Sequence, residues 1–150
     1  MMNSDRGTAL FRDWQFALAL LAGPAIWLGM YVVFQPQLSL WWLDDPLKLL
    51  MVGLLYPVLE EFVFRGGVQG WLIEKPWGVR SLLGITYANG VTSAVFTSLH
   101  FFAHPPLMAA AVFVPSLLFG YFRDRYAGWL LPSMILHSLY NTGYFILFGG

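Results

Sequence analysis

Residues 81–122 read SLLGITYANGVTSAVFTSLHFFAHPPLMAAAVFVPSLLFGYF and contain no Asp, Glu, Lys or Arg. An α-helix needs about 20 residues to cross the hydrocarbon core of a bilayer, so this stretch is long enough for two crossings. The natural break between them is His104-Pro105-Pro106, because consecutive prolines lack backbone donors and favour a turn. The stretch therefore predicts two transmembrane helices, at about residues 81–103 and 107–122.

Two more charge-free stretches flank this one, at residues 14–43 and 126–150. The first predicts a helix that ends near Phe34 and a short interfacial segment at residues 39–43, which carries two tryptophans. A further apolar run, residues 47–73, is interrupted near its middle by three charges. We expect an all-α, polytopic membrane bundle of about five transmembrane helices, at residues 14–34, 48–73, 81–103, 107–122 and 127–148.

The composition agrees with a membrane protein. Hydrophobic residues make up 58% of the 150-residue chain and charged residues 11%, whereas soluble domains carry about 25% charged residues. Eight basic residues balance eight acidic ones, which argues against nucleic-acid binding, and the absence of cysteine excludes a thiol nucleophile. We expect a single membrane domain, residues 1–150, with the lipid bilayer around it and with no nucleic-acid partner, metal or cofactor.

Basic residues set the expected orientation, because cytoplasmic loops are enriched in Lys and Arg. With five spans, the side that holds the N-terminus has nearly all of these residues, and the opposite side has only Lys48. The bias places the N-terminus in the cytoplasm and, for a bacterial protein, the chain in the inner (plasma) membrane. The basic residues on the N-terminal side are Arg6, Arg12, Lys75, Arg80, Arg123 and Arg125.

The three charges inside the second span are Glu60, Glu61 and Arg65. A charged side chain at the middle of a transmembrane helix costs about 2.5–3.5 kcal/mol, so such residues usually face the bundle interior and mark a site. Arg65 follows Glu61 by four residues, a spacing that predicts an ion pair and leaves Glu60 the less neutralised carboxylate. Pro57 is expected to clash with the carbonyl of Gly53 and to kink the helix just before the acidic pair.

Polar residues recur at helical spacing in two other spans. Phe96, His100 and His104 are four residues apart, as are His137 and Asn141, so each set lies along one face of its helix. Polar groups inside a bilayer need partners, and one shared cluster is the simplest arrangement. The depths match only if the second helix continues to about residue 73.

The three sets of residues resemble the motifs of a known family. Glu60-Glu61-Phe62-Val63-Phe64-Arg65 resembles the Glu-Glu-x-x-x-Arg motif of the CPBP family, which comprises CAAX proteases and bacteriocin-processing enzymes and is also called the ABI family. Phe96-Thr97-Ser98-Leu99-His100 is similar to its Phe-x-x-x-His motif, and His137-Ser138-Leu139-Tyr140-Asn141 to its His-x-x-x-Asn/Asp motif. The order of the three is that of the family, and the resemblance covers about residues 48–142, the expected catalytic core.

The resemblance implies a glutamic-type intramembrane endopeptidase. In that family the first glutamate activates a water molecule with help from the histidine of the second motif, which here are Glu60 and His100. The third motif supplies an oxyanion hole, here from His137 and Asn141, and preorganised donors of this kind are most effective where water is excluded. Glu61 and Arg65 would support the site, and Phe96 and His104 are the candidates for its wall.

Three other interpretations stay open. A metalloprotease could use His100, His104, His137 and a glutamate, although the sequence has no His-Glu-x-x-His motif. A non-catalytic scaffold or bacteriocin-immunity protein could use the same fold, and a proton or ion pathway could use Glu61. For the protease, the expected partner is a membrane-anchored protein or peptide, for example one with a C-terminal sorting signal that is cut near the outer leaflet.

Overall fold

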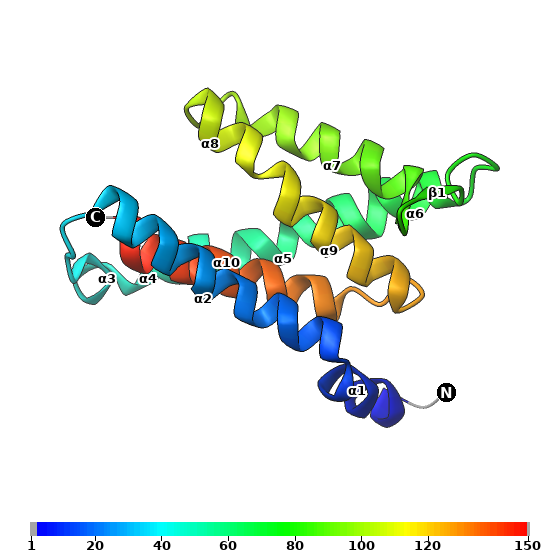
Figure 1. Ribbon diagram of the computed structural model, residues 1–150, viewed down its shortest axis with the longest axis horizontal. Coiled ribbons are helices and arrows are strands. Elements are labelled where there is room, and N and C mark those ends of the chain that lie inside the picture. Colours follow the sequence, from blue (N-terminus) through cyan, green and yellow to red (C-terminus); the bar gives the residue numbers. More distant parts are fainter. Residues whose placement is uncertain (1–2, 150) are drawn as a thin grey trace. The chain divides into compact units, whose positions relative to one another are not determined.

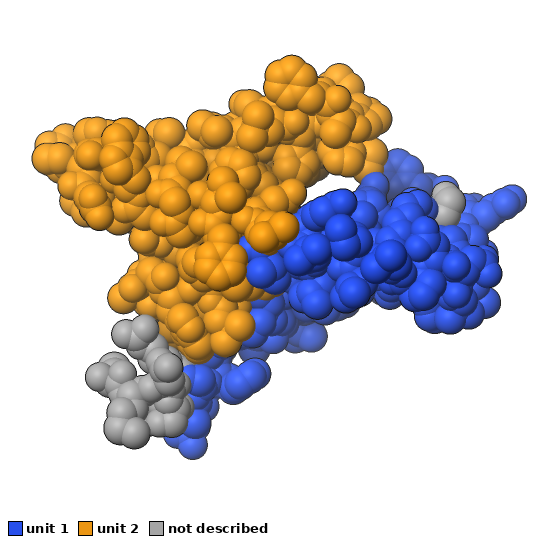
Figure 2. Space-filling view, turned by 180° about the vertical axis from the view of Figure 1, so that it is seen from behind, with its two compact units in different colours: residues 1–58, 135–150 blue, residues 59–134 orange. Residues whose placement is uncertain are grey.

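The computed structural model describes residues 3–149, and most of them are helical, as predicted (Figure 1). The chain forms two compact units, which Figure 2 colours separately and which are described one at a time. The first comprises Met1–Val58 and Ile135–Gly150, and the second comprises Leu59–Met134.

The first unit begins with α1 (Asn3–Arg12) and α2 (Trp14–Phe34), and α2 has the bounds that its charge-free stretch predicts. The Asp13 carboxylate accepts a hydrogen bond from the Gln15 N–H and caps the start of α2. The end of α2 is closed by Gln35, which adopts a left-handed conformation and donates its N–H to the Tyr31 carbonyl. The remaining elements of this unit are α3 (Trp41–Asp44), α4 (Pro46–Leu50), η1 (Met51–Leu55), the start of α5 (Tyr56–Glu61) and most of α10 (Leu131–Phe148).

Residues 46–73 form one run of helix that contains two π-helical segments, η1 and η2 (Phe62–Val68). Pro57 explains the first, because it has no N–H to donate to the carbonyls one turn earlier. The carbonyls of Val52 and Gly53 instead accept hydrogen bonds from side chains of α10, at 3.3 Å from Asn141 Nδ2 and 3.1 Å from Thr142 Oγ1. Where the sequence predicts a kink at Pro57, the structure has a π-helical segment whose free carbonyls are bonded to α10.

The second unit differs from the predicted helix at residues 81–103. Residues 81–86 form a hairpin of β1 (Ser81–Leu82) and β2 (Ile85–Thr86), and α7 begins only at Tyr87 and ends at His100. The turn is set by Leu83 and Gly84, whose φ angles of 52° and 83° suit a two-residue hairpin. The other elements of this unit are η2, α6 (Gln69–Ile73), α8 (Pro106–Ala111) and α9 (Phe113–Arg125).

Two helices of residues 3–149 are long and apolar enough to cross a membrane, namely Trp14–Phe34 and Pro106–Arg125. The second of them is interrupted at Val112 between α8 and α9, and it extends three residues beyond the predicted end at residue 122. The last helix, α10, starts at Leu131 instead of at residue 127.

The distribution of side chains is the reverse of that in a soluble protein. Large apolar side chains are widely exposed, for example Val33 at 73%, Val114 at 69% and Phe62 at 58%. Such a surface is stable only against an apolar solvent or a partner, and polar groups then collect inside. The buried polar and charged residues are Glu61, Arg65, Gln69, Asn89, Thr92, Ser93, Thr97, Ser116, Ser133 and His137.

Candidate active site

The acidic pair ends α5, and Arg65 follows it within η2. Arg65 Nε lies 3.4 Å from Glu61 Oε2, and both side chains are almost completely buried, with exposed fractions of 0% and 1%. The ion pair predicted from the spacing is therefore confirmed. Glu60 is only half-buried, so the two adjacent carboxylates have different surroundings.

Arg65 is also held by two further helices of this unit, α7 and α9. Its Nη2 donates to the backbone carbonyl of Ser116 at 2.8 Å and to Ser116 Oγ at 2.7 Å, on α9. Its guanidinium carbon lies 5.8 Å from the ring centre of Phe96, on α7, within the range of a cation–π contact. Arg65 thus connects Glu61 to both α7 and α9.

The contacts between η2 and α7 fix which residues lie at the same level. The rings of Phe64 and Phe96 meet edge to face with centres 4.9 Å apart, and the hairpin joins the end of α6 to the start of α7. The two runs of helix are therefore antiparallel. Glu60 lies four residues before Phe64, and His100 lies four residues after Phe96. This register brings Glu60 to the level of His100.

The Phe-x-x-x-His motif orders its own histidine. His100 Nδ1 lies 2.9 Å from the carbonyl oxygen of Phe96, and a carbonyl only accepts, so Nδ1 carries the hydrogen. In the neutral ring the lone pair is then on Nε2. The exposed His104 stacks on His100, with ring centres 5.6 Å apart and planes 20° apart. Phe96 and His100 share one face of α7 as predicted, whereas His104 lies four residues beyond the end of the helix.

His137 and Asn141 lie one turn apart on α10, in the first unit. His137 is buried, with 4% of its surface exposed. Asn141 uses one N–H of its amide in the bond to the Val52 carbonyl. Tyr140, between them, donates its hydroxyl to the Ala19 carbonyl at 2.6 Å and so ties α10 to α2.

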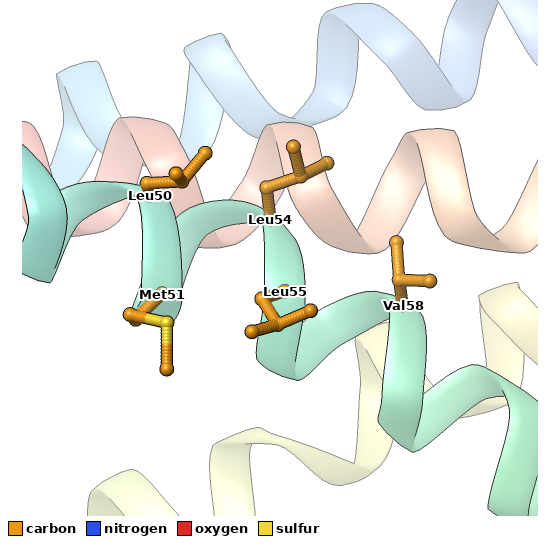
Figure 3. Close-up of a pocket in the computed structure, with 5 residues that line it drawn as sticks. All are labelled: Leu50, Met51, Leu54, Leu55 and Val58. Atoms are coloured by element: carbon orange, nitrogen blue, oxygen red, sulfur yellow. The ribbon is translucent and has the colours of Figure 1, made fainter.

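An apolar hollow with a volume of about 420 Å³ lies along η1 in the first unit. In Figure 3, Leu50, Leu54 and Val58 project from one side of the helix and Met51 and Leu55 from another. The same helix continues from Val58 to Glu60 within α5. Val58, the last residue that lines the hollow, precedes Glu60 by two residues in the sequence.

Reasoning from the sequence missed Ser116, the residue that holds Arg65 through two hydrogen bonds. The available signal was a serine followed four residues later by Gly120, both inside an apolar run. A small polar residue and a glycine at this spacing allow close packing of helices in a membrane. Within residues 59–134, the described His, Asp and Glu side chains include no group of three or more that could hold a metal ion.

Comparison with known families identifies the chain at the family level. A family model described as Type II CAAX prenyl endopeptidase Rce1-like matches residues 40–143. The match includes all three motifs, and it confirms the resemblance to the CPBP family. Searches of the curated proteins and of the solved structures give no match.

Proposed function

The chain belongs to the Type II CAAX prenyl endopeptidase Rce1-like family, a family of membrane-embedded proteases, and we propose that it is an intramembrane endopeptidase of the glutamic type. Its reaction is the hydrolysis of a peptide bond in a membrane-anchored protein or peptide. The observation that carries the proposal is the register of α5, η2 and α7, which puts the less buried carboxylate of Glu60 level with His100.

Glu60 is the general base of this proposal, and Glu61 is a supporting residue. The Glu61 carboxylate is paired with Arg65 and almost completely buried, so a substrate cannot reach it. Glu60 is half-buried and is therefore the carboxylate that a water molecule and a substrate can reach. His100 presents the lone pair of Nε2, which can accept a proton or orient the attacking water.

The oxyanion that forms on the attacked carbonyl needs hydrogen-bond donors. We assign this role to His137 and Asn141, which lie one turn apart on α10. An amide has two N–H bonds, and the bond to Val52 uses one, so the other can donate to the oxyanion. In other acyl-transfer enzymes, removal of one such donor lowers kcat by about 10²–10³-fold.

The proposed topology has five spans, formed by α2, residues 46–73, α7, α8 with α9, and α10. The N-terminus lies in the cytoplasm, because the basic residues of the loops gather on that side. The chain has no cysteine, so Arg80→Cys and Lys48→Cys each create a single labelling site. A membrane-impermeant maleimide should label residue 48 in intact bacterial cells and residue 80 only after lysis, and the reverse pattern would overturn this orientation.

The substrate class is taken from the family, whose members act on membrane-anchored proteins. The hollow of the first unit is lined by apolar side chains alone, a chemistry that suits an apolar anchor segment. We propose a membrane-anchored substrate with a C-terminal sorting signal, cut toward the outer leaflet. A tail-anchored reporter, co-expressed with the protein, should release a product on the outer side, whereas cleavage confined to cytosolic CAAX peptides would overturn this substrate.

The test of catalysis compares the wild-type chain with Glu60→Gln in cleavage of candidate anchors. The substitution removes the base but keeps the shape of the side chain, so we expect cleavage to fall by about 10²–10⁴-fold. Glu74→Gln is the matched control, because Glu74 is exposed at the end of α6. This variant should cleave the candidate anchors as fast as the wild type does. Cleavage retained in Glu60→Gln would favour another base, and loss of cleavage with a chelator would favour a metalloprotease. A biological phenotype retained in the Glu60 variant, with no cleavage by the wild type, would favour a non-catalytic scaffold.

A further inference from the structure

Two helices of the second unit are joined by polar residues at matching intervals of four. On one side Arg65 and Gln69 follow each other along η2 and α6, and on the other Ser116 and Gly120 follow each other along α9. Arg65 donates to Ser116, and Gln69 Nε2 donates to the Gly120 carbonyl at 3.0 Å. We call these four residues the polar seam. It fixes how far α9 is shifted along the helix that carries the acidic pair.

Ser116 holds Arg65 in a defined orientation. Both of its oxygens accept from the same nitrogen, Nη2, at 2.8 and 2.7 Å. The guanidinium is planar, so fixing Nη2 also fixes the direction in which Nε points, which is toward Glu61. Ser116 and Arg65 are both completely buried, so water does not compete for these bonds.

We propose that Ser116 is a positioning residue for the acidic pair and that it acts through Arg65. This inference rests on the proposed function, because the pair it positions includes the proposed base Glu60. With Arg65 fixed, Glu61 is held by its ion pair, and Glu60, the neighbouring residue of α5, is held by the same helix. The helix α9, which carries none of the three sequence motifs, thereby becomes part of the machinery that orients the attacking water.

Ser116→Ala tests this with little disturbance of the fold. The alanine keeps the backbone carbonyl, which still accepts one bond from Arg65 Nη2, and removes only the 2.7 Å bond to Oγ. The Arg65 guanidinium is then held by one hydrogen bond fewer. The Glu61 carboxylate, which is paired with it, is also held less firmly. Because the loss affects the geometry of the reacting groups and no substrate contact, we expect kcat to fall by about tenfold while KM stays within about twofold.

Ser93→Ala is the matched control. Ser93 is also a completely buried serine of the second unit, but its hydroxyl donates to Asn89 within α7 and not to Arg65 or either carboxylate. The kcat of the Ser93→Ala variant should stay close to that of the wild type. Equal losses of kcat in Ser93→Ala and Ser116→Ala would show that any buried serine matters, and would overturn the positioning role.

Two double-mutant cycles identify the path of the effect. In the Arg65→Lys background, Ser116→Ala should lower kcat no further, because the residue through which it acts has gone. A full additional tenfold loss there would overturn the proposal. The second cycle combines Ser116→Ala with Glu61→Gln and measures the midpoint of thermal unfolding, which does not depend on cleavage.

Ser116 and Glu61 are both bonded to Arg65, so the midpoint shifts of the two substitutions should not add. Additive shifts would overturn the proposed coupling. Non-additive shifts in a chain that cleaves no substrate, wild type included, would refute the proposed function and leave the coupling standing. The two failures are thus distinguishable.

Discussion

Gly120→Ala should be among the most damaging small substitutions in the chain. A Cβ at this position would clash with Asn89 Oδ1 and lie 2.8 Å from Gln69 Oε1. Neither amide can turn away freely, because Asn89 Nδ2 donates to the Leu117 carbonyl at 2.9 Å and Gln69 Nε2 donates to the carbonyl of Gly120 itself. The extra methyl group therefore has to push α9 away from α6 and α7.

The size of the effect can be estimated from these contacts. Overpacking of a tight site costs about 1–3 kcal/mol, and each buried hydrogen bond that is lost costs about 0.5–1.5 kcal/mol. Alanine is a better helix former than glycine by about 1 kcal/mol, which offsets part of this. We expect a net loss of about 3 kcal/mol in the free energy of unfolding, and a midpoint lower by roughly 10 °C.

Thermal unfolding of the purified protein in detergent is the assay, and Gly90→Ala is the control. Gly90 lies in the interior of α7, next to Asn89, and a Cβ there meets no atom within 4 Å. The control should be neutral or slightly stabilising, because only the gain in helix propensity applies. If Gly120→Ala unfolds at the same temperature as Gly90→Ala, the close packing of α9 against Asn89 and Gln69 is wrong.

Three further predictions concern stability. Arg65→Met should lower the free energy of unfolding by about 3–5 kcal/mol, because it leaves the Glu61 charge buried without its partner. The double variant Arg65→Met, Glu61→Gln should recover part of that loss in the same thermal assay. Leu83→Gly should raise the free energy of unfolding by about 0.5–1 kcal/mol and the unfolding midpoint slightly, because Leu83 has φ 52° and a glycine adopts this conformation without strain. An unchanged or lower midpoint would argue against strain at this position. Thr142→Val should cost about 1 kcal/mol, because the Gly53 carbonyl loses its 3.1 Å hydrogen bond, and faster amide exchange of η1 would accompany it.

The ion pair of the site could be predicted because both of its members are on one helix. Glu61 and Arg65 are four residues apart, and this interval defines a neighbour on a helix surface whatever the rest of the chain does. The shared face of Phe96 and His100 follows from the same interval. Ser116 could not be found in this way, because its partner lies on another helix and the pairing depends on how far one helix is shifted along the other.

The start of α7 could not be predicted from charge or hydropathy. Residues 81–86 are as free of charge as the helix that follows, so an apolar hairpin and an apolar helix give the same signal. Leu83-Gly84 was the available local indication of a turn, and it was outweighed by the length of the apolar stretch. The segment η2 was also missed, because a change from i+4 to i+5 hydrogen bonding leaves no mark in the order of polar and apolar residues.

The shortness of α7 has a consequence for the surrounding lipid. Its 14 residues rise about 21 Å, whereas the hydrocarbon core of a typical bilayer is about 30 Å thick. The chain that follows His100 exposes Phe102 at 89% and Leu107 at 83%, as expected of side chains in contact with acyl chains. In the proposed topology the short helix favours a thinner bilayer beside α7, so turnover is expected to depend on the length of the acyl chains.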